Sequence, residues 1–411
     1  MRILVLTAYY QPDGGPAAPL YTSLCEALAQ RGHEVTVITA VPHYPSGNVP
    51  EEYRVARSFK SIENGVSITR VSLPSINRSK LGLRLLQFGV FQIASTLSSL
   101  DTHYDVLLTH APSLEVWLPF TFHSIVRRKP LVYSVHDVYP AVGISLGIFK
   151  NKAIIFLLTA LEKFCLHKAS KIRILSSSFA PALMKLDVKE EKLVLIYDWA
   201  DTDSIHPLSR WNSFSEEQGF TNRFVILYAG NIGLSQGLES ILEAARRLAD
   251  QPDILFVFVG DGTGRQALIE KAKTYHLENV RFIPFQPRER VSEVFASADI
   301  SLVSLRKGSG AGSLPSKTFS IMASERPIIA SVDSDSDTWD LIQRSCCGVC
   351  VNPETPELIA DAILTLKGDA KLRMELGKNG RQYVLENHSP ASAALHFEKL
   401  LSQVVLENSK R

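Results

Sequence analysis

The stretch "GSLPSKTFSIMASERPIIAS", residues 312–331, decides the fold class because it joins three kinds of local structure. It begins as a polar loop led by glycine, continues with helical periodicity from Lys317, and ends in a short β-branched strand. Lys317 stands on the first turn of that helix, where unpaired N–H groups already carry partial positive charge, and no carboxylate is close in sequence. This placement is typical either of a solvated surface lysine or of an anion-binding site.

The same succession of strands and helices runs from one end of the chain to the other. Strands are expected at 2–7, 34–39, 66–71, 105–109, 131–135, 171–175 and 193–196, and again at 224–229, 254–259, 280–283, 300–303, 327–330 and 348–351. Helical segments lie between most of them. This alternation predicts an α/β protein with two doubly wound parallel sheets.

A chain of 411 residues is longer than one hydrophobic core usually serves, so we expect two domains. Residues 197–219 are polar, rich in turn residues and without sustained periodicity, which is typical of a linker. We therefore place a first domain at 1–198 and a second at 199–389. A final helix, 390–406, follows the last strand and is expected to pack back on the first domain, so that 390–411 belong with it.

Charge is unevenly distributed along the chain. The net charge is +2, but residues 1–198 carry +6 and the remaining residues carry −4. No dense basic stripe with aromatic residues is present, so we expect no nucleic-acid partner. A mildly basic first half suits a surface that faces anionic lipid.

Five cysteines at irregular spacing, without a second metal-binding pair, indicate a reducing compartment, and we expect a cytoplasmic protein. The opening "MRILVLTAYY" has too short an apolar run for a signal peptide and is expected to form the first strand. No run of 18 uncharged apolar residues is present, so we expect no membrane-spanning segment.

Two apolar helical segments of the first half, 80–97 and 150–168, have basic residues near their starts. They are equally compatible with core helices and with amphipathic docking to an anionic leaflet. The second interpretation would make the protein peripheral on the inner face of the membrane.

Glycine-rich loops follow the first strand of each half. Gly14 and Gly15 leave the backbone open to a ligand, although a tight turn would also use glycine. In the second half, "YAGNIGLSQGLES" supplies Gly230, Gly233 and two uncharged amides, Asn231 and Gln236, as possible phosphate donors.

The next strand of the second half ends in "FVFVGDGTGRQAL", with Gly260, Gly262 and Gly264. Such a loop is found in dinucleotide-binding proteins. However, the acidic residue expected at the end of a following strand is absent, so an NAD site is the weaker interpretation.

Two histidines close neighbouring strands of the first half. His136 in "LVYSVHDVYP" is followed by Asp137, which could orient its ring, and His110 ends another strand. A neutral imidazole can hydrogen-bond a sugar hydroxyl or a reacting oxygen, so both are candidates for direct contact with a ligand. Histidines at strand ends are also often structural.

Three aspartates in "SVDSDSDTWD", Asp333, Asp335 and Asp337, could bind a divalent cation. Aspartate and serine at a turn before a helix more often cap that helix. We expect no metal site.

Several stretches together resemble bacterial glycosyltransferases of family 4, closest to the branch that builds extracellular, capsular and O-antigen polysaccharides. They are "GGPAAPLYTSLCEALAQRGHEVTVITAVPHYPSG", "HDVYP", "YAGNIGLSQGLES", "FVGDGTG", "SLPSKTFSIMASERPIIAS" and "CGVCVNPETPELIADAI". The resemblance covers nearly the whole chain. It implies a GT-B fold, a donor nucleotide sugar bound mainly by the second domain, an acceptor bound by the first, and retaining transfer without an obligatory metal or other cofactor. The family's strand-end histidine corresponds to His136.

The sequence departs from the family at two places. The two glutamates of the family motif would fall on Gly312 and Ser320, and the arginine and lysine that clamp the diphosphate would fall on Asn231 and Gln236. With these charges missing, Lys317 is the best placed cation for a diphosphate, and Arg306 in "SLRKGSG" is the second.

The expected function is transfer of a sugar from a nucleotide diphosphate sugar to a glycan acceptor that is attached to a lipid. Expected catalytic residues are His136, Lys317 and Arg306. The expected acceptor site comprises Gly14, Gly15, His110 and Asp137. The expected donor site comprises Gly15, Gly230, Asn231, Gly233, Gln236, Gly260, Asp261, Gly262, Phe285, Ser316, Lys317 and Ser320. Two alternatives remain: a GT-B protein that binds a sugar nucleotide without transfer, and a sugar-nucleotide epimerase.

Overall fold

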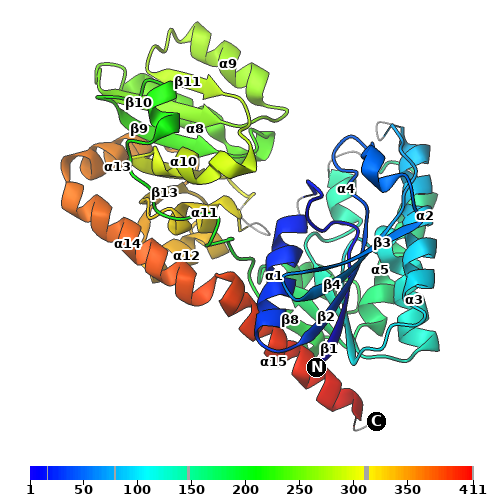
Figure 1. Cartoon of the computed structure of the whole chain (residues 1–411). Coiled ribbons are helices and arrows are strands. Elements are labelled where there is room, and N and C mark those ends of the chain that lie inside the picture. The colour runs from blue at the N-terminus through cyan, green and yellow to red at the C-terminus, as the bar shows by residue number, and fades with distance from the viewer. Residues whose placement is uncertain (16, 78–79, 146–148, 310–313, 410–411) are drawn as a thin grey trace. The chain divides into compact units, whose positions relative to one another are not determined.

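The computed structural model describes residues 1–15, 17–77, 80–145, 149–309 and 314–409. The chain divides into two compact units (Figure 1). Unit 1 contains Met1–Asp198 and Pro390–Arg411, and unit 2 contains Trp199–Ser389. Each unit has its own central sheet, so each is described by itself.

In the described residues of unit 1, the sheet has eight strands in the order β3-β4-β2-β1-β5-β6-β7-β8. Their bounds are β1 (Arg2–Leu6), β2 (Glu34–Ala40), β3 (Ser58–Glu63), β4 (Val66–Val71), β5 (Val106–His110), β6 (Leu131–Val135), β7 (Lys171–Ile174) and β8 (Leu193–Leu195). β3 pairs antiparallel with β4, whereas the other described neighbours pair in parallel. β5 and β6 are buried throughout, as expected for the middle of a parallel sheet covered on both faces.

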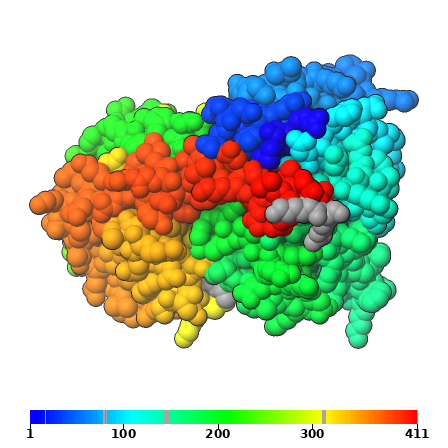
Figure 2. All heavy atoms as spheres, turned by 90° about the horizontal axis from the view of Figure 1, so that it is seen from below, coloured from blue at the N-terminus to red at the C-terminus, as the bar shows by residue number. Residues whose placement is uncertain are grey.

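Three helices of unit 1, α2 (Leu81–Ser98), α3 (Ser113–Thr121) and α5 (Lys152–Lys168), pack side by side over the sheet (Figure 1). Two more, α1 (Ala18–Gln30) and α15 (Pro390–Ser409), pack against each other, and Figure 2 shows α15 in red beside the blue α1. The short helices are α4 (Ala141–Ser145) and α6 (Phe179–Met184). Because α15 buries Phe397 and Leu401 in unit 1, the expectation that the last helix packs back on the first domain is confirmed.

The six described strands of the unit 2 sheet are all parallel, in the order β11-β10-β9-β12-β13-β14. They are β9 (Phe224–Ala229), β10 (Ile254–Val259), β11 (Val280–Ile283), β12 (Ile300–Ser304), β13 (Ile328–Ser331) and β14 (Gly348–Val351). This is the strand order of nucleotide-binding doubly wound folds, with the reversal of chain order between β9 and β12. The predicted fold class is therefore confirmed.

The helices of unit 2 cover both faces of its sheet. α8 (Leu238–Arg247) contacts α9 (Arg265–Thr274) and α13 (Pro356–Gly368). α10 (Val291–Ala296), α11 (Lys317–Ala323) and α12 (Asp337–Ser345) contact β9 and β12–β14. The long α14 (Ala370–Asn387) packs on α11.

Two features differ from the sequence-based expectation. The edge strand β3 was not predicted, because "SFKSIE" is polar and mostly exposed and its strand form depends on pairing with β4. Most of the expected linker is folded into unit 2. It contains α7 (Ser213–Glu217), whose capping box at Asn212 starts the helix and whose Phe214 is buried against Phe220 at a ring distance of 6.0 Å.

Candidate functional site

The loops that follow β9 and β10 pack directly on each other through glycines. Gly230 and Gly260 have φ angles of +135° and +141°. A Cβ atom on Gly260 would lie 2.0 Å from the carbonyl oxygen of Gly230. Folding of the two loops therefore requires glycine here whether or not a ligand is present.

A cavity of about 200 Å³ lies at the carboxyl ends of these strands, next to the start of α11. Five of the expected donor-site residues line it together: Gly230, Phe285, Ser316, Lys317 and Ser320. Val259, Val291, Val294 and Phe295 add an apolar wall. Phe285 is 74% exposed, so its ring is available for contact with a planar ligand group. Apolar walls with a few converging polar groups are typical of small-molecule sites.

Lys317 is the basic residue among those that line this cavity. Its ammonium donates to the hydroxyl oxygen of Tyr228 at 2.6 Å and to Oε1 of Gln236 at 3.1 Å, and lies 3.9 Å from the centre of the Tyr228 ring. In the part of the chain that the structure describes, no carboxylate lies within 4.0 Å of it. Burial of the ammonium lowers the pKa of Lys317 to about 7, although the side chain as a whole keeps some exposed surface.

Tyr228 is the residue of this cluster that the sequence interpretation missed. It is fully buried in β9, where an aromatic residue in an apolar strand reads as core. The available signal was its place two residues before the glycine loop, because the hydroxyl of a buried tyrosine needs a partner. The hydroxyl donates to the backbone oxygen of Asn231 at 2.7 Å.

Arg306, the second cation expected at the diphosphate, does not line the cavity. Its guanidinium is exposed, with Nε 4.0 Å from a carboxylate oxygen of Glu354, while its backbone N–H donates to Ser235. This structure without ligand does not bring Arg306 and Lys317 together, and the role of Arg306 at the diphosphate stays a prediction.

The remaining donor candidates of unit 2 lie in the loops that follow β9 and β10 and do not line the cavity. Gln236 contacts Lys317, Asn231 is exposed, and Asp261 accepts the backbone N–H of Gly262 at 2.8 Å. Gly233 lies beside the Asn231 side chain. Gly312 lies outside the described residues.

In unit 1, His136 at the end of β6 is held by Tyr21 of α1. The Tyr21 hydroxyl lies 3.2 Å from Nε2 of His136, while Nδ1 has no hydrogen-bond partner among the described residues. Burial lowers the pKa of His136 to about 3, against a raising effect of Asp198, so the ring is neutral at pH 7. Asp137 could have oriented this ring, but the ring's described hydrogen-bond partner is Tyr21 and the Asp137 side chain is exposed. Its place in the acceptor site stays a prediction.

His110, at the end of β5, stacks on Tyr21 with ring centres 5.1 Å apart. Its Nδ1 lies 2.8 Å from the backbone oxygen of Ala111 and its Nε2 lies 2.8 Å from the hydroxyl of Thr7. Both nitrogens are thus engaged inside unit 1. His110 supports the Tyr21 ring, which in turn contacts His136.

The glycine loop after β1 is organised by the buried carboxylate of Asp13. It accepts the backbone N–H of Gly15 at 2.7 Å and that of His43 at 2.7 Å. A Cβ atom on Gly15 would lie 2.5 Å from the ring of Tyr9, so packing alone requires glycine there. Gly14 is less constrained, because a Cβ atom would lie 3.4 Å from the oxygen of Tyr44.

The aspartate cluster 333–337 shows the capping arrangement. The Ser336 side chain accepts the N–H of Trp339 and starts α12, and Asp333 accepts the N–H of Gly308 at 2.9 Å. Among the described residues, no group of three or more His, Cys, Asp or Glu side chains is arranged to hold a metal ion.

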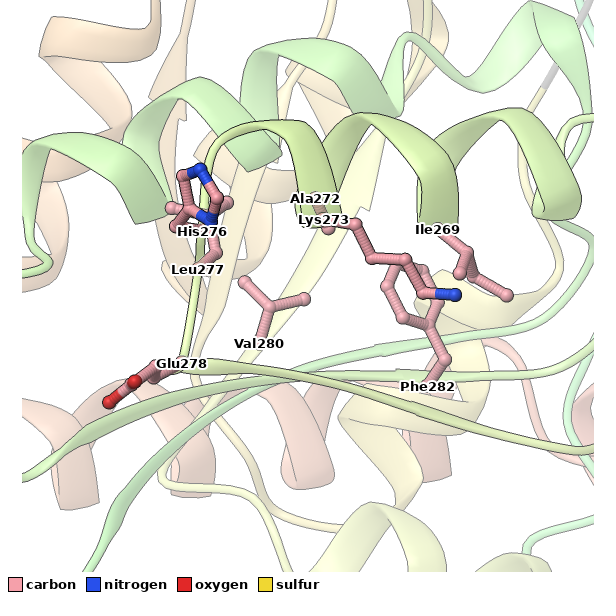
Figure 3. A pocket seen from close by; sticks show the side chains of 8 residues that line it. All are labelled: Ile269, Ala272, Lys273, His276, Leu277, Glu278, Val280 and Phe282. Atoms are coloured by element: carbon pink, nitrogen blue, oxygen red, sulfur yellow. The ribbon is translucent and has the colours of Figure 1, made fainter.

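A second cavity, of about 390 Å³, lies between α9 and the edge strand β11 (Figure 3). Val280 and Phe282 point from the strand toward the helix, and Lys273, His276 and Glu278 lie around them. Val280 is the first residue of β11, so this cavity opens toward the amino end of the strand. Ligands of open α/β sheets bind at the carboxyl ends of the strands.

Two doubly wound units in one chain, with a cavity at the carboxyl ends of the second sheet, define the GT-B class of glycosyltransferase fold. The chain belongs to the glycosyltransferases of family 4, since the description "Glycosyltransferase Family 4" matches residues 20–204 and "Glycosyl transferases group 1" matches residues 209–383. These two matches cover most of both units.

Two similar proteins come from bacteria. WcaI of Escherichia coli K12, named for colanic acid biosynthesis, is 27% identical over 373 residues, which cover 88% of this chain and 91% of WcaI. WbjE of Pseudomonas aeruginosa, named as a glycosyltransferase, is 28% identical over 299 residues, 71% of this chain and 73% of WbjE.

Solved structures share the fold. HepE of Anabaena, solved with UDP, matches with a TM-score of 0.70 at 15% identity and covers 98% of this chain and 100% of HepE. The sucrose-phosphate synthase of Thermosynechococcus elongatus matches with a TM-score of 0.69 at 18% identity, with 99% of both chains covered.

Proposed function

We propose that this glycosyltransferase moves a sugar from a nucleotide diphosphate sugar to a glycan acceptor with retention of anomeric configuration, and that it needs neither a metal ion nor another cofactor. The observation that carries the proposal is the ammonium of Lys317. It stands in the unit 2 cavity with neutral hydrogen-bond partners, so its charge is available to a phosphate.

In the proposed reaction, the bond between the anomeric carbon and the donor diphosphate breaks as the acceptor hydroxyl attacks from the same face. The new glycosidic bond joins the anomeric carbon to the acceptor oxygen. The proton of the acceptor hydroxyl passes to the departing phosphate oxygen. Lys317 stabilises the negative charge that grows on the diphosphate. α11 has seven residues, so the lysine charge, rather than the helix end, carries this role.

His136 is proposed to hydrogen-bond the transferred sugar as a neutral imidazole. A ring with a pKa of about 3 does not accept a proton at neutral pH. His136 is therefore proposed to position the sugar and not to act as a base. Nδ1 is the nitrogen left for such a contact, since Nε2 faces Tyr21.

The acceptor is proposed to be a growing cell-surface polysaccharide carried on a lipid, with the enzyme on the cytoplasmic face of the membrane. The name of WcaI and the resemblance to the polysaccharide branch support the glycan. Five free cysteines are compatible with a reducing compartment.

The contact with the membrane is proposed to lie on α2 and α5. Their described exposed apolar side chains are Leu85, Leu86, Ile93, Leu97, Ile154, Phe156 and Leu157. Lys80, Arg84, Lys150 and Lys152 are exposed near the starts of the same helices. Apolar side chains flanked by basic ones suit an anionic leaflet. In the part of the chain that the structure describes, no helix has the length and hydropathy to cross a bilayer.

Flotation with vesicles tests this surface. The protein is expected to float with phosphatidylglycerol vesicles at low salt, to float less at high salt, and not to float with phosphatidylcholine. The double variant Phe156→Asp, Leu157→Asp should stay in solution. Leu364→Asp, at a residue that is 41% exposed in unit 2, is the matched control and should float. A wild-type protein that never floats contradicts the docking surface.

The donor site is tested by thermal unfolding with UDP, GDP, ADP and dTDP sugars. A bound donor at 100 times its Kd adds about 2.7 kcal/mol to the free energy of unfolding. Lys317→Ala should lose the shift, whereas Lys307→Ala, at an exposed lysine that does not line the cavity, should keep it. Slow donor hydrolysis without acceptor would separate a working enzyme from a binding protein, and NMR of the released sugar would reveal an epimerase. No shift with any donor would contradict the proposal.

A further inference from the structure

The ammonium of Lys317 has three protons, and β9 together with the loop that follows it provides two acceptors for them. One is the hydroxyl oxygen of Tyr228 at 2.6 Å and the other is Oε1 of Gln236 at 3.1 Å. In the described part of the chain, no third protein acceptor lies within hydrogen-bond distance. The third proton is thus left for a ligand in the cavity that Lys317 lines.

Both acceptors are neutral, which distinguishes this arrangement from an ion pair. The Tyr228 hydroxyl has its own acceptors in the backbone oxygen of Asn231 at 2.7 Å and Oε1 of Gln236 at 3.0 Å, so its single proton is directed away from Lys317 and a lone pair of the same oxygen accepts from the ammonium. The two acceptors fix the position of the ammonium without cancelling its charge. A carboxylate in place of Gln236 would fix it equally well but would neutralise it.

Gly230 completes the enclosure. A Cβ atom at this position would lie 3.3 Å from Cε and 3.4 Å from Nζ of Lys317. The side chain of Lys317, from α11, therefore lies against the loop that follows β9. Residues outside α11 thus position this cation. The sequence alone showed only that Gln236 lacks a charge.

We propose that Tyr228 and Gln236 are positioning residues that hold Lys317 as an unneutralised cation for the diphosphate of the donor. This inference rests on the proposed function and names the residues that position Lys317 at the diphosphate site. It predicts that the side chain at position 236 must be uncharged for the donor diphosphate to bind well.

Proton uptake on binding is the distinguishing consequence. The side chains that contact the ammonium are Tyr228 from β9 and Gln236 from the following loop. The other polar side chains that line the cavity are Ser316, Ser320 and Gln286, which are uncharged. Burial raises the pKa of Tyr228 above its ordinary value, so none of these groups titrates near pH 7. Because the pKa of Lys317 is about 7 without ligand, most of this side chain is neutral at pH 8, and binding of an anion there should be coupled to uptake of a proton by Lys317.

The test is titration calorimetry of the full chain with inorganic pyrophosphate and with UDP, in buffers of different ionisation enthalpy. We expect Tyr228→Phe to weaken pyrophosphate binding about tenfold, since it removes one hydrogen bond to a charged group. Gln236→Glu should weaken it more, by about fiftyfold, and should abolish proton uptake at pH 8, because the new carboxylate keeps Lys317 protonated without ligand. Gln236→Ala should have a smaller effect than Gln236→Glu. Tyr275→Phe, at a tyrosine that does not line the cavity, is the control for loss of a hydroxyl.

The outcomes separate this inference from the proposed function. If Lys317→Ala loses binding while Tyr228→Phe and Gln236→Glu bind like the wild type, the positioning role is overturned and the function stands. If Lys317→Ala also binds normally, or the wild type binds neither ligand, both are overturned. Circular dichroism and thermal unfolding of each variant establish that it is folded. Weakened binding in Gln236→Glu with unchanged proton uptake would also contradict the proposal, since it would indicate a structural effect.

Discussion

The hydroxyl of Tyr21 lies 3.2 Å from Nε2 of His136, although 114 residues separate them in the chain. The tyrosine comes from α1 and the histidine from the end of β6, so the helix orients the ring at the strand end. His110 stacks against the other side of this contact, with its ring centre 5.1 Å from that of Tyr21.

Removal of this hydroxyl should misorient His136 without changing its chemistry. Tyr21→Phe is expected to lower kcat about three- to tenfold, by loss of one hydrogen bond, with little change in KM for the donor. Nitrogen NMR of His136 should show an altered tautomer balance. Wild-type kcat together with an unchanged spectrum would show that Tyr21 does not orient the ring.

Arg306→Ala and Lys317→Ala should differ sharply. The Arg306 guanidinium is exposed near Glu354 and does not line the cavity, so its removal should lower kcat/KM less than about threefold. Loss of Lys317 should lower kcat by about a hundredfold, because it removes stabilisation of the leaving diphosphate. Steady-state rates with a saturating acceptor measure both. Equal effects would indicate that Arg306 moves to the ligand when the donor binds.

Stability without ligand should depend on pH through Lys317. Its pKa falls from the ordinary 10.5 to about 7 in the folded protein. Below pH 7 both states hold the proton, and the folded state bears the full cost of the enclosed ammonium. Between pH 7 and 10.5 the unfolded state binds a proton that the folded state does not, so this contribution makes stability rise with pH. The difference in Tm between Lys317→Met and the wild type should shrink over this range, as measured by calorimetry. A constant difference would contradict the lowered pKa.

Chelation should leave transfer intact. Since Lys317 is proposed to supply the positive charge at the diphosphate, EDTA should change kcat less than about twofold. Added Mg²⁺ should likewise change kcat less than about twofold. The assay measures release of nucleoside diphosphate after dialysis against EDTA. A large loss that Mg²⁺ restores would reassign the charge to a metal ion.

Much of the fold follows from the sequence because buried parallel strands are continuous apolar runs. β9 and β10 lie at their expected bounds for this reason, since every residue of β10 is buried. β3 gave no such signal, because its residues face solvent and its pairing partner decides its conformation. Residues 199–219 are joined to unit 2 by contacts such as Phe214–Phe220 and the ion pair Arg210–Asp299, which local composition does not reveal.

The candidate site was predictable in its residue types but not in its contacts. Lys317, Phe285, Ser316 and Ser320 could be placed near a strand end from the order of elements alone. The role of Tyr228 could not be predicted, because an aromatic residue in an apolar strand matches the pattern of a core position. Only the hydrogen bond from Lys317 to its hydroxyl shows that Tyr228 belongs to the site. Arg306 illustrates the opposite case, since sequence proximity to the site does not fix where a long side chain is directed.

The last helix of the chain, α15, completes the unit to which the first residues belong. Its Glu398 accepts a hydrogen bond from Nε of Arg31, at the C-terminal end of α1, at 2.6 Å. During synthesis on the ribosome, all of residues 199–389 leave the exit tunnel before this helix does. Unit 2 can therefore fold while the amino-terminal unit still lacks α15. Until residues 390–409 have left the ribosome, α1 has no packing partner on the face that α15 covers.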